Sequence, residues 1–576
     1  MGMAKIGLRS AILLGVGSIA LAACGGGSSP GTSSSGSSGA GTKGGTLYIL
    51  TLDSQFLHLD PQRNYTGEDL AFASGYITRT LNAYTFAQGQ DGWKITPDLA
   101  TDTGTATDNA QTWTWTLKDG AKWQDGTPVT CEDIKYGISR TFATTTITDG
   151  PSYAIQYLDI PKNKDGSSVY KGPYDKTKSN DTAAFDKAIV CDGSTITFHL
   201  NQPLVDFNSA VTLTAFAAVP KASDTGAKYD DAVQSDGPYQ ITSYKKNQKL
   251  VLDRNPNWDP ASDSYRPAYP DTIEVDFGLD PAVIDKRIME DQGNDQFAIM
   301  REAVQPQDLA TVFNSPQYAD RRWNDYDPYS LYIAINCDHI KNQKLRNAIQ
   351  AAWPRATVRT IAGGQYAGDL SDGVIKSNFA GYQPTNMWNG LIGQKIGDNG
   401  DPAYAKQLIK DSGEKMPTLD YQYAQTPTND KIVGAVVTAM AKAGITVKPD
   451  PLDPGQYYGI VFDPQKAGDL ITGGWGPDWG NASTIIPPLF TPAGGWDMSQ
   501  YNDPAFNTAV DNAKKMTNLT DQVAAWNQLN AQAMKLGLVV PTRWSKTQRI
   551  AGSKVGGGYI WAPYGSWPYG DMWVNQ

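Results

Sequence analysis

Histidine and the sequence patterns of common enzymes are scarce or absent in this chain. Only three of its 576 residues are histidine, and His58, His199 and His339 do not lie at a zinc-ligand spacing. There is no HExxH motif, no GxSxG nucleophile elbow, and no GxxxxGKS or GxxxxGKT phosphate-binding loop. We therefore expect no metal, no cofactor and no catalytic residue, and we expect the chain not to be an enzyme.

The sequence also has no basic stripe and few long apolar runs. Its net charge is −10 and its pI is about 5.0, which makes nucleic acid a poor partner. Beyond the amino-terminal region, no apolar run reaches the roughly 20 residues that a helix needs to span a bilayer.

The amino terminus has the pattern of a secretory signal. Lys5 and Arg9 precede an apolar run over residues 11–20, which is too short to span a bilayer. The stretch LAAC that ends at Cys24 resembles the lipobox of bacterial lipoproteins, in which the cysteine becomes the lipidated first residue. An ordinary signal peptide with a chance cysteine is the alternative. We predict a signal peptide over 1–23 and a protein lipid-anchored to the outer face of the cell membrane.

A Gly/Ser-rich segment follows the lipobox cysteine. With Cys24 it covers residues 24–44, and its composition cannot bury apolar surface. We expect it to act as a linker that holds the mature protein away from the membrane.

Strand and helix patterns are mixed along the rest of the chain. Alternation of apolar and polar residues predicts strands in TWTWTL, STITFHL, KLVLDR and DTIEVDF, and GGTLYILTL reads as a first strand. Thr130, with Asp133 three residues later, predicts a helix start, and periodic apolar residues predict helices around 345–352 and over 520–536. There is no regular βαβ order, so we predict a mixed α/β chain with two or more lobes.

Three cysteines remain once Cys24 is assigned to the lipid. Cys131 opens a predicted helix and Cys191 opens a predicted strand in the same region, so we predict a possible disulfide between them outside the cell. The alternative is three buried thiols, including Cys337.

The segment GGWGPDWG, residues 473–480, sets one carboxylate between two tryptophans. Asp478 lies between Trp475 and Trp479, and a carboxylate walled by apolar rings needs a cation. The nearest basic residues in the sequence are Lys466 and Arg543. Two interpretations stay open on these residues alone. Asp478 caps a turn or pairs with a distant arginine such as Arg543, or its cation comes from a ligand.

Several segments together resemble the family 5 extracellular solute-binding proteins, the peptide- and oligopeptide-binding components of ABC importers. The match covers nearly all of the mature chain, in the order of the family. Its segments are LDPQ, PDLA, WTWTLKDGAKWQDGTPVTCEDIKYGISRTF, SDGPYQITSYKKNQKLVLDRNPNW, IAINCDHIKNQKLRNAIQAAWPR, GGWGPDWGNASTIIPPLF and YNDPAFNTAVDNAKK. Pro354 and Cys337 depart from the family's pattern, and Pro354 should stop a helix at about Trp353.

The resemblance implies an α/β, two-lobed periplasmic-binding-protein-like fold (type II, cluster C) with an extra inserted domain. Ligand would lie between domains I and III, which close around it by a hinge. The implied boundaries are 45–85, 205–300 and 540–576 for the discontinuous domain I, 86–204 for the inserted domain II, and 301–539 for domain III.

The resemblance also implies a peptide ligand and its site. The aspartate of the family's tryptophan-x-x-aspartate pattern holds the peptide's amino group, and here that residue is Asp478. Implied partners are an ABC permease and its ATPase subunits, with the protein itself a monomer. The implied ligand-binding residues are Asp478, Trp475, Gly474, Gly476, Tyr65, Thr66 and Gly67.

Two alternatives remain. Some members of the family bind oligosaccharides, nickel complexes or other small solutes, and the 16 tryptophans and 29 tyrosines leave sugars open. In another class, the aromatic content would suit a secreted carbohydrate-active enzyme.

Overall fold

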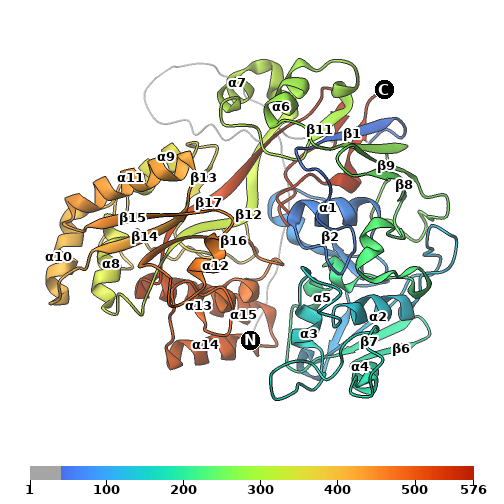
Figure 1. Ribbon diagram of the computed structural model, residues 1–576, viewed down its shortest axis with the longest axis horizontal. Helices are drawn as coiled ribbons and strands as arrows, with labels where there is room; N and C mark the ends of the chain where they lie inside the picture. Colours follow the sequence, from blue (N-terminus) through green and yellow to red (C-terminus); the bar gives the residue numbers. More distant parts are fainter. Residues whose placement is uncertain (1–40) are drawn as a thin grey trace, which may run out of the picture. The chain divides into compact units, whose positions relative to one another are not determined.

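The structure is a computed structural model that describes residues 41–576 (Figure 1). The predicted signal peptide, Cys24 and most of the linker lie outside the described residues. Among residues 41–576, no helix combines the length and the apolar character needed to cross a bilayer.

The first large sheet has five strands in the order β11-β1-β10-β9-β8. Strand β1 pairs in parallel with both β10 and β11, whereas β10, β9 and β8 run antiparallel. The predicted alternation appears in β9, where Leu250 and Leu252 are buried, and in β10, where Ile273 and Val275 are buried. The strands are β1 (Thr46–Leu50), β8 (Tyr239–Lys245), β9 (Lys249–Arg254), β10 (Thr272–Asp276) and β11 (Ala298–Met300).

A four-stranded antiparallel sheet is formed in the order β4-β5-β7-β6. Trp113 and Trp115 are buried from one face of β5, as their alternation predicts. Helix α2 (Cys131–Arg140) begins with the predicted capping box, in which Thr130 and Asp133 bond each other's backbone N–H. The strands are β4 (Thr105–Thr107), β5 (Thr112–Thr116), β6 (Ile189–Asp192) and β7 (Thr195–His199).

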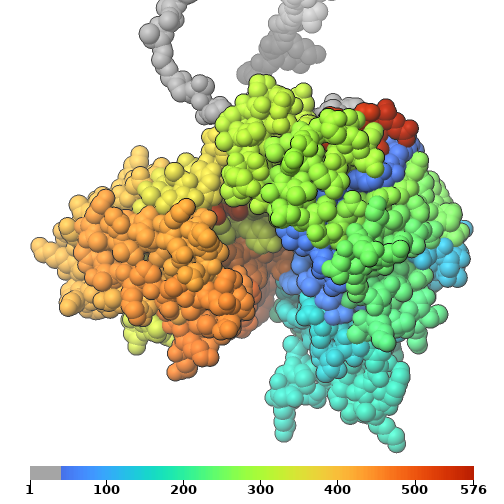
Figure 2. Space-filling view, turned by 45° about the horizontal axis from the view of Figure 1, so that its top comes forward, coloured from blue at the N-terminus to red at the C-terminus, as the bar shows by residue number. Residues whose placement is uncertain are grey.

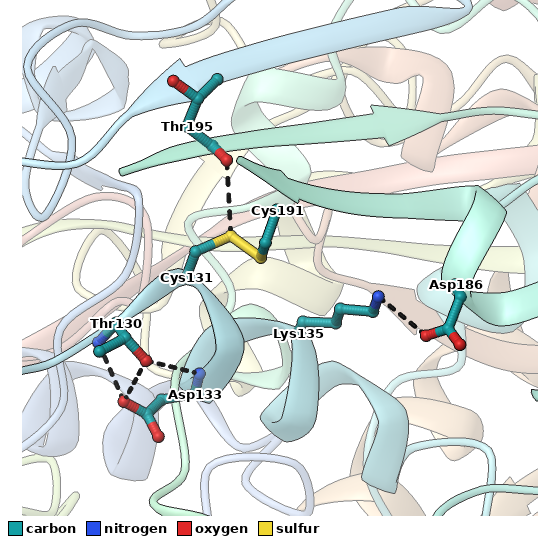
Figure 3. The surroundings of a disulfide bond; sticks show 7 residues. All are labelled: Thr130, Cys131, Asp133, Lys135, Asp186, Cys191 and Thr195. Atoms are coloured by element: carbon teal, nitrogen blue, oxygen red, sulfur yellow. Dashed lines mark hydrogen bonds and ion pairs between the residues drawn. A yellow bond between two sulfur atoms is a disulfide. The ribbon is translucent and has the colours of Figure 1, made fainter. Parts of the chain in front are cut away.

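A disulfide joins α2 to β6 (Figure 3). It links Cys131 and Cys191, the pair favoured in the sequence, with Cα atoms 5.9 Å apart. Cys337 is a buried free thiol, and burial raises its pKa to about 12. The bond therefore closes a loop of 60 residues within the region 86–204.

The second large sheet has six strands in the order β13-β17-β12-β16-β14-β15. Helix α10 (Pro402–Ser412) packs on α8 (Gln343–Ala352), and α11 (Pro427–Lys442) packs on β15. The α10–α11 part of the chain, in orange, is exposed on the face that Figure 2 shows. The strands are β12 (Arg322–Ile335), β13 (Gly368–Leu370), β14 (Leu419–Ala424), β15 (Val447–Leu452), β16 (Leu470–Trp475) and β17 (Val539–Ile550).

The predicted helices of this part are present. Helix α8 ends at Ala352, two residues before Pro354, as the proline predicts. Helix α15 (Leu519–Leu536) buries Trp526, Leu529 and Ala533, and it is capped by Gly537, whose φ of 71° suits glycine.

Two long strands connect the two large sheets. Strands β12 and β17 pair antiparallel from Arg322↔Ile550 to Ala334↔Val539. Directly after the Arg322↔Ile550 pair, Ala551 forms a bridge with Ile299 of β11, the edge strand of the first sheet. The five-stranded sheet takes its strands from residues 46–300, the four-stranded sheet from 105–199, and the six-stranded sheet from 322–550. The boundaries of the three domains stay a prediction.

Candidate ligand-binding site

Asp478 lies in the loop after β16, where two tyrosines from distant segments reach it. The hydroxyl of Tyr65, just before α1 (Gly67–Tyr76), donates a hydrogen bond of 2.5 Å to Oδ1. The hydroxyl of Tyr153, the first residue of α3 (Tyr153–Tyr157), donates one to Oδ2. Both carboxylate oxygens are therefore fixed by side chains more than 300 residues away in the sequence.

The Asp478 carboxyl is half-buried and has no cationic partner in residues 41–576. Burial raises its pKa, and the hydrogen bonds from Tyr153 and Tyr65 lower it in part. Burial and the charge of Asp478 raise the pKa of Tyr153 well above its ordinary value, so this phenol keeps its proton as a donor.

Arg543 is not the counter-ion of Asp478. Burial lowers the pKa of Arg543, and the charge of Asp327 raises it in part. Its Nε is buried without a hydrogen-bond partner in the part of the chain that the structure describes. The interpretation that pairs Asp478 with Arg543 is therefore wrong.

The two tryptophans beside Asp478 have different surroundings. Trp475 donates from Nε1 to the carbonyl oxygen of Thr484 at 2.6 Å and packs on Trp496, with ring centroids 5.2 Å apart. Trp479 is fully buried and meets the ring of Tyr153 edge-on at 4.9 Å. Trp479 thus supports the tyrosine that bonds Asp478.

Asp206 holds the loop after β16 in place through hydrogen bonds to Trp479 and Ser483. It is buried, and its Oδ2 accepts hydrogen bonds from Trp479 Nε1 at 2.7 Å and from Ser483 Oγ at 2.6 Å. Its Oδ1 is buried without a partner in the described residues, and burial raises the pKa of its carboxyl. Asp206 therefore fixes the residue next to Asp478.

A cavity of about 460 Å³ opens beside Asp478. Its size lies within the roughly 300–1,000 Å³ of typical small-molecule sites. Residues 150–157 and 202–204 supply one part of its wall and residues 475–494 another. The lining residues are Tyr65, Gly150, Pro151, Ser152, Tyr153, Gln156, Tyr157, Gln202, Leu204, Trp475, Asp478, Ser483, Thr484, Pro487, Pro488, Thr491, Ala493, Gly494, Lys514 and Gln522.

The predicted ligand-binding residues divide into two groups. Tyr65, Trp475 and Asp478 line the cavity. The other four, Thr66, Gly67, Gly474 and Gly476, are not among its lining residues.

The three predicted glycines lie in close packing contacts. A Cβ added to Gly67 would lie 2.8 Å from the carbonyl oxygen of Tyr564, and one on Gly476 would lie 2.8 Å from the ring of Tyr329. A Cβ on Gly474 would meet Leu331 at 2.8 Å. Tight packing thus gives these glycines a role in the fold, and main-chain pairing with a ligand stays a prediction.

Sequence reasoning missed the contribution of the segment PSYAIQY. Tyr153 and Tyr157 are four residues apart and stack at 5.7 Å, so helical spacing could have paired them. No local signal links them to Asp478, which lies 325 residues away from Tyr153. The family resemblance implied a ligand between domains I and III, but the cavity wall also includes residues of the predicted domain II, 86–204.

Known proteins resemble this chain over most of its length. The Escherichia coli (strain K12) protein named "Periplasmic oligopeptide-binding protein OppA" is 22% identical over 476 residues, which is 78% of this chain and 79% of that protein. The same organism's "Periplasmic murein peptide-binding protein MppA" is 24% identical over 471 residues, 78% of this chain and 79% of that protein.

Solved structures share the fold. The protein titled "Clavulanic acid biosynthesis oligopeptide binding protein 2" matches with a TM-score of 0.84 and 25% identity, covering 93% of this chain and 96% of its own. The unliganded open form of the murein tripeptide-binding protein MppA matches with a TM-score of 0.70 and 19% identity, covering 94% of this chain and 99% of its own. The predicted two-lobed α/β fold is thereby confirmed.

These relatives and neighbours are binding proteins, so the alternative of a secreted carbohydrate-active enzyme is set aside. The family model described as "Bacterial extracellular solute-binding proteins, family 5 Middle" matches residues 94–497, more than half of the chain. The chain therefore belongs to the bacterial extracellular solute-binding proteins of family 5.

Proposed function

We propose that this chain is the substrate-binding lipoprotein of an ABC importer, which captures peptides between its lobes and delivers them to a membrane permease. One observation carries the proposal. The Asp478 carboxylate lines a cavity and accepts two phenol hydrogen bonds, yet it has no ion-pair partner in residues 41–576. A half-buried carboxylate without a cation favours a ligand that brings one.

The amino group of a peptide suits this site. An ionised carboxylate offers about four lone-pair positions, and the two phenols occupy two of them. The others can accept charge-assisted hydrogen bonds from an ammonium group, which are stronger than neutral ones. Closure of the lobes would remove water and strengthen these bonds further.

Relatives named as oligopeptide-binding proteins support a peptide over other amines. An extended peptide could pair with the main chain of Gly474 and Gly476 on one side and of Tyr65, Thr66 and Gly67 on the other. Main-chain pairing does not depend on side chains, so such a site accepts many peptide sequences.

The amino-terminal segment supports a membrane location. Lipid on Cys24 and the linker over 24–44 would hold the protein at the outer face of the cell membrane. There a monomer would meet the permease and its ATPase subunits.

Within the family, oligosaccharides or other small solutes remain the second candidate. The aromatic rings near the cavity favour sugars, but a sugar without an amine leaves Asp478 unpaired. In residues 41–576 no group of three or more histidine, cysteine, aspartate or glutamate side chains could hold a metal ion, which disfavours a nickel-binding role.

Mass spectrometry of ligands that co-purify with the protein tests the proposal. We expect peptides with a free amino terminus to be released when the purified protein is denatured. Bound sugars or other amine-free solutes, with no peptides, would overturn it. Added peptide should also raise the melting temperature without being consumed, as expected for binding to the folded state alone.

A further inference from the structure

The cavity beside Asp478 holds one charge of each sign. Among its lining residues only Asp478 and Lys514 are charged. Lys514 is the last residue of α14 (Pro504–Lys514), and it is not among the ligand-binding residues that the family resemblance implies.

Lys514 keeps most of its hydrogen-bonding capacity. Its Nζ lies 3.2 Å from Oδ1 of Asp511, one helical turn earlier. The Asp511 side chain is 60% exposed, and exposed pairs of this kind contribute little energy. An ammonium group has three donors, so Lys514 can bind a second acceptor that enters the cavity.

The other polar lining groups suit an anion next to Lys514. Gln202 and one N–H of Gln156 are neutral donors, since the other N–H of Gln156 donates to Ser152 Oγ. The Thr491 hydroxyl already donates to the carbonyl oxygen of Pro487, and no lining residue other than Asp478 is acidic. Gln522 is already engaged, since it donates to the carbonyl oxygen of Ala513 and accepts from Asn481. An anionic ligand group in this cavity would therefore find one cation, Lys514, and the amide donors of Gln202 and Gln156, and it would compete with Asp511 for Lys514.

We propose that Lys514 forms a carboxylate subsite in this cavity, so that the protein selects ligands that carry a carboxylate in addition to their amino group. The inference rests on the proposed function, because the ammonium on Asp478 places the ligand in the cavity. The carboxylate has two possible sources, an acidic side chain near the amino terminus or the carboxyl terminus of a short peptide.

Titration calorimetry on the purified chain with four peptides separates these sources. Glu-Ala-Ala amide against Gln-Ala-Ala amide tests the side chain, and Ala-Ala against Ala-Ala amide tests the carboxyl terminus. The variant is Lys514→Met, and Lys514→Arg should restore the charge. The matched control is Lys515→Met, which removes the same charge from the next, exposed residue outside the cavity.

We expect the unsubstituted protein to prefer the carboxylate-bearing member of at least one pair by about tenfold, as for a hydrogen bond between charged groups. Lys514→Met should abolish that preference and leave binding of the amides unchanged, whereas Lys515→Met should change neither. Equal binding within both pairs, or an equal loss for all four peptides in Lys514→Met, overturns the subsite. If no peptide binds the unsubstituted protein, the proposed function itself fails, and the subsite fails with it.

Discussion

The hydroxyl of Tyr153 donates a hydrogen bond to the carboxylate of Asp478, although the two residues lie 325 positions apart in the sequence. Tyr153 comes from residues 86–204, which are predicted to form the inserted domain II, and Asp478 comes from the loop after β16. Residues of this predicted domain therefore help to form the candidate amine site as well as part of the cavity wall.

Tyr153→Phe should weaken binding of a free peptide amine. The substitution keeps the ring that packs on Trp479 and removes only the hydroxyl. A hydrogen bond to a charged group contributes about 1.5–3 kcal/mol, so we expect a loss of roughly 10- to 150-fold in affinity by calorimetry. The control is Tyr157→Phe, because Tyr157 lines the same cavity and forms no hydrogen bond to Asp478 among the described residues. An equal effect of both substitutions would assign the loss to the cavity wall.

Peptide affinity should fall as the pH falls through the raised pKa of Asp478. Binding needs the ionised carboxylate, and burial raises this pKa above its ordinary range of about 3.9. The peptide amine stays protonated over the same range, since its ordinary pKa is about 7.7–8.0. Calorimetry from about pH 4 to about pH 7 checks this, and constant affinity over that range would contradict it.

The same raised pKa should make the unliganded protein more stable as the pH falls, although it weakens peptide binding. A carboxyl whose folded pKa is raised binds its proton more readily in the folded state than in the unfolded state. Its contribution to the free energy of unfolding therefore increases as the pH falls from the folded pKa toward the ordinary value. Asp478→Asn should remove this contribution from the pH dependence of unfolding without peptide, measured by urea denaturation.

Lys376 should be a stabilising residue at the register shift of β12. Its buried ammonium donates to the carbonyl oxygens of Asp327, Tyr329 and Ser545, where the pairing of β12 with β17 shifts register. Burial lowers its pKa to about 8. Lys376→Met leaves these carbonyls without their donor, and we expect a loss of about 1–3 kcal/mol for each unsatisfied buried group that does not gain water.

An exposed lysine of the same sheet provides the control for Lys376. Lys448 of β15 pairs with Asp420, and their side chains are 71% and 49% exposed, so Lys448→Met should cost less than about 1 kcal/mol. Urea unfolding at constant pH compares the two variants. An equal midpoint for both would show that the buried lysine contributes no more than a surface pair.

The Cys131–Cys191 disulfide should stabilise the part of the chain over residues 86–204. Removal of a native disulfide typically costs about 2–5 kcal/mol, and the closed loop of 60 residues places the expected loss in that range. The double variant Cys131→Ser with Cys191→Ser should lower the melting temperature. The control is Cys337→Ala, which leaves the bond intact, so peptide mapping without reduction should still find Cys131 linked to Cys191. Recovery of Cys131 and Cys191 as free thiols from the unsubstituted protein would contradict the prediction.

Local patterns in the sequence predicted the elements well. Alternation placed β5, β7, β9 and β10, the capping box of Thr130 and Asp133 placed the start of α2, and Pro354 placed the end of α8. These signals are local because each depends on neighbours within a strand or a helical turn.

The site was only partly predictable. The family pattern identified Asp478, Trp475 and Tyr65, which line the cavity. Tyr153, Asp206 and Lys514 reach the site through the packing of segments far apart in the sequence, and no spacing rule relates them to Asp478. Sequence patterns therefore predicted the carboxylate together with Trp475 and Tyr65, but not Tyr153, Asp206 or Lys514.

The most direct test of the amine site compares one peptide with a free and with an acetylated amino terminus by calorimetry. We predict that acetylation removes most of the affinity, and that Asp478→Asn weakens the free peptide by about 2–5 kcal/mol, as for loss of one partner of a buried charge pair. Asp338→Asn, at an exposed position outside the cavity, should bind like the unsubstituted protein. Equal affinity for the free and the acetylated peptide would contradict the assignment of Asp478 as the group that binds the amine.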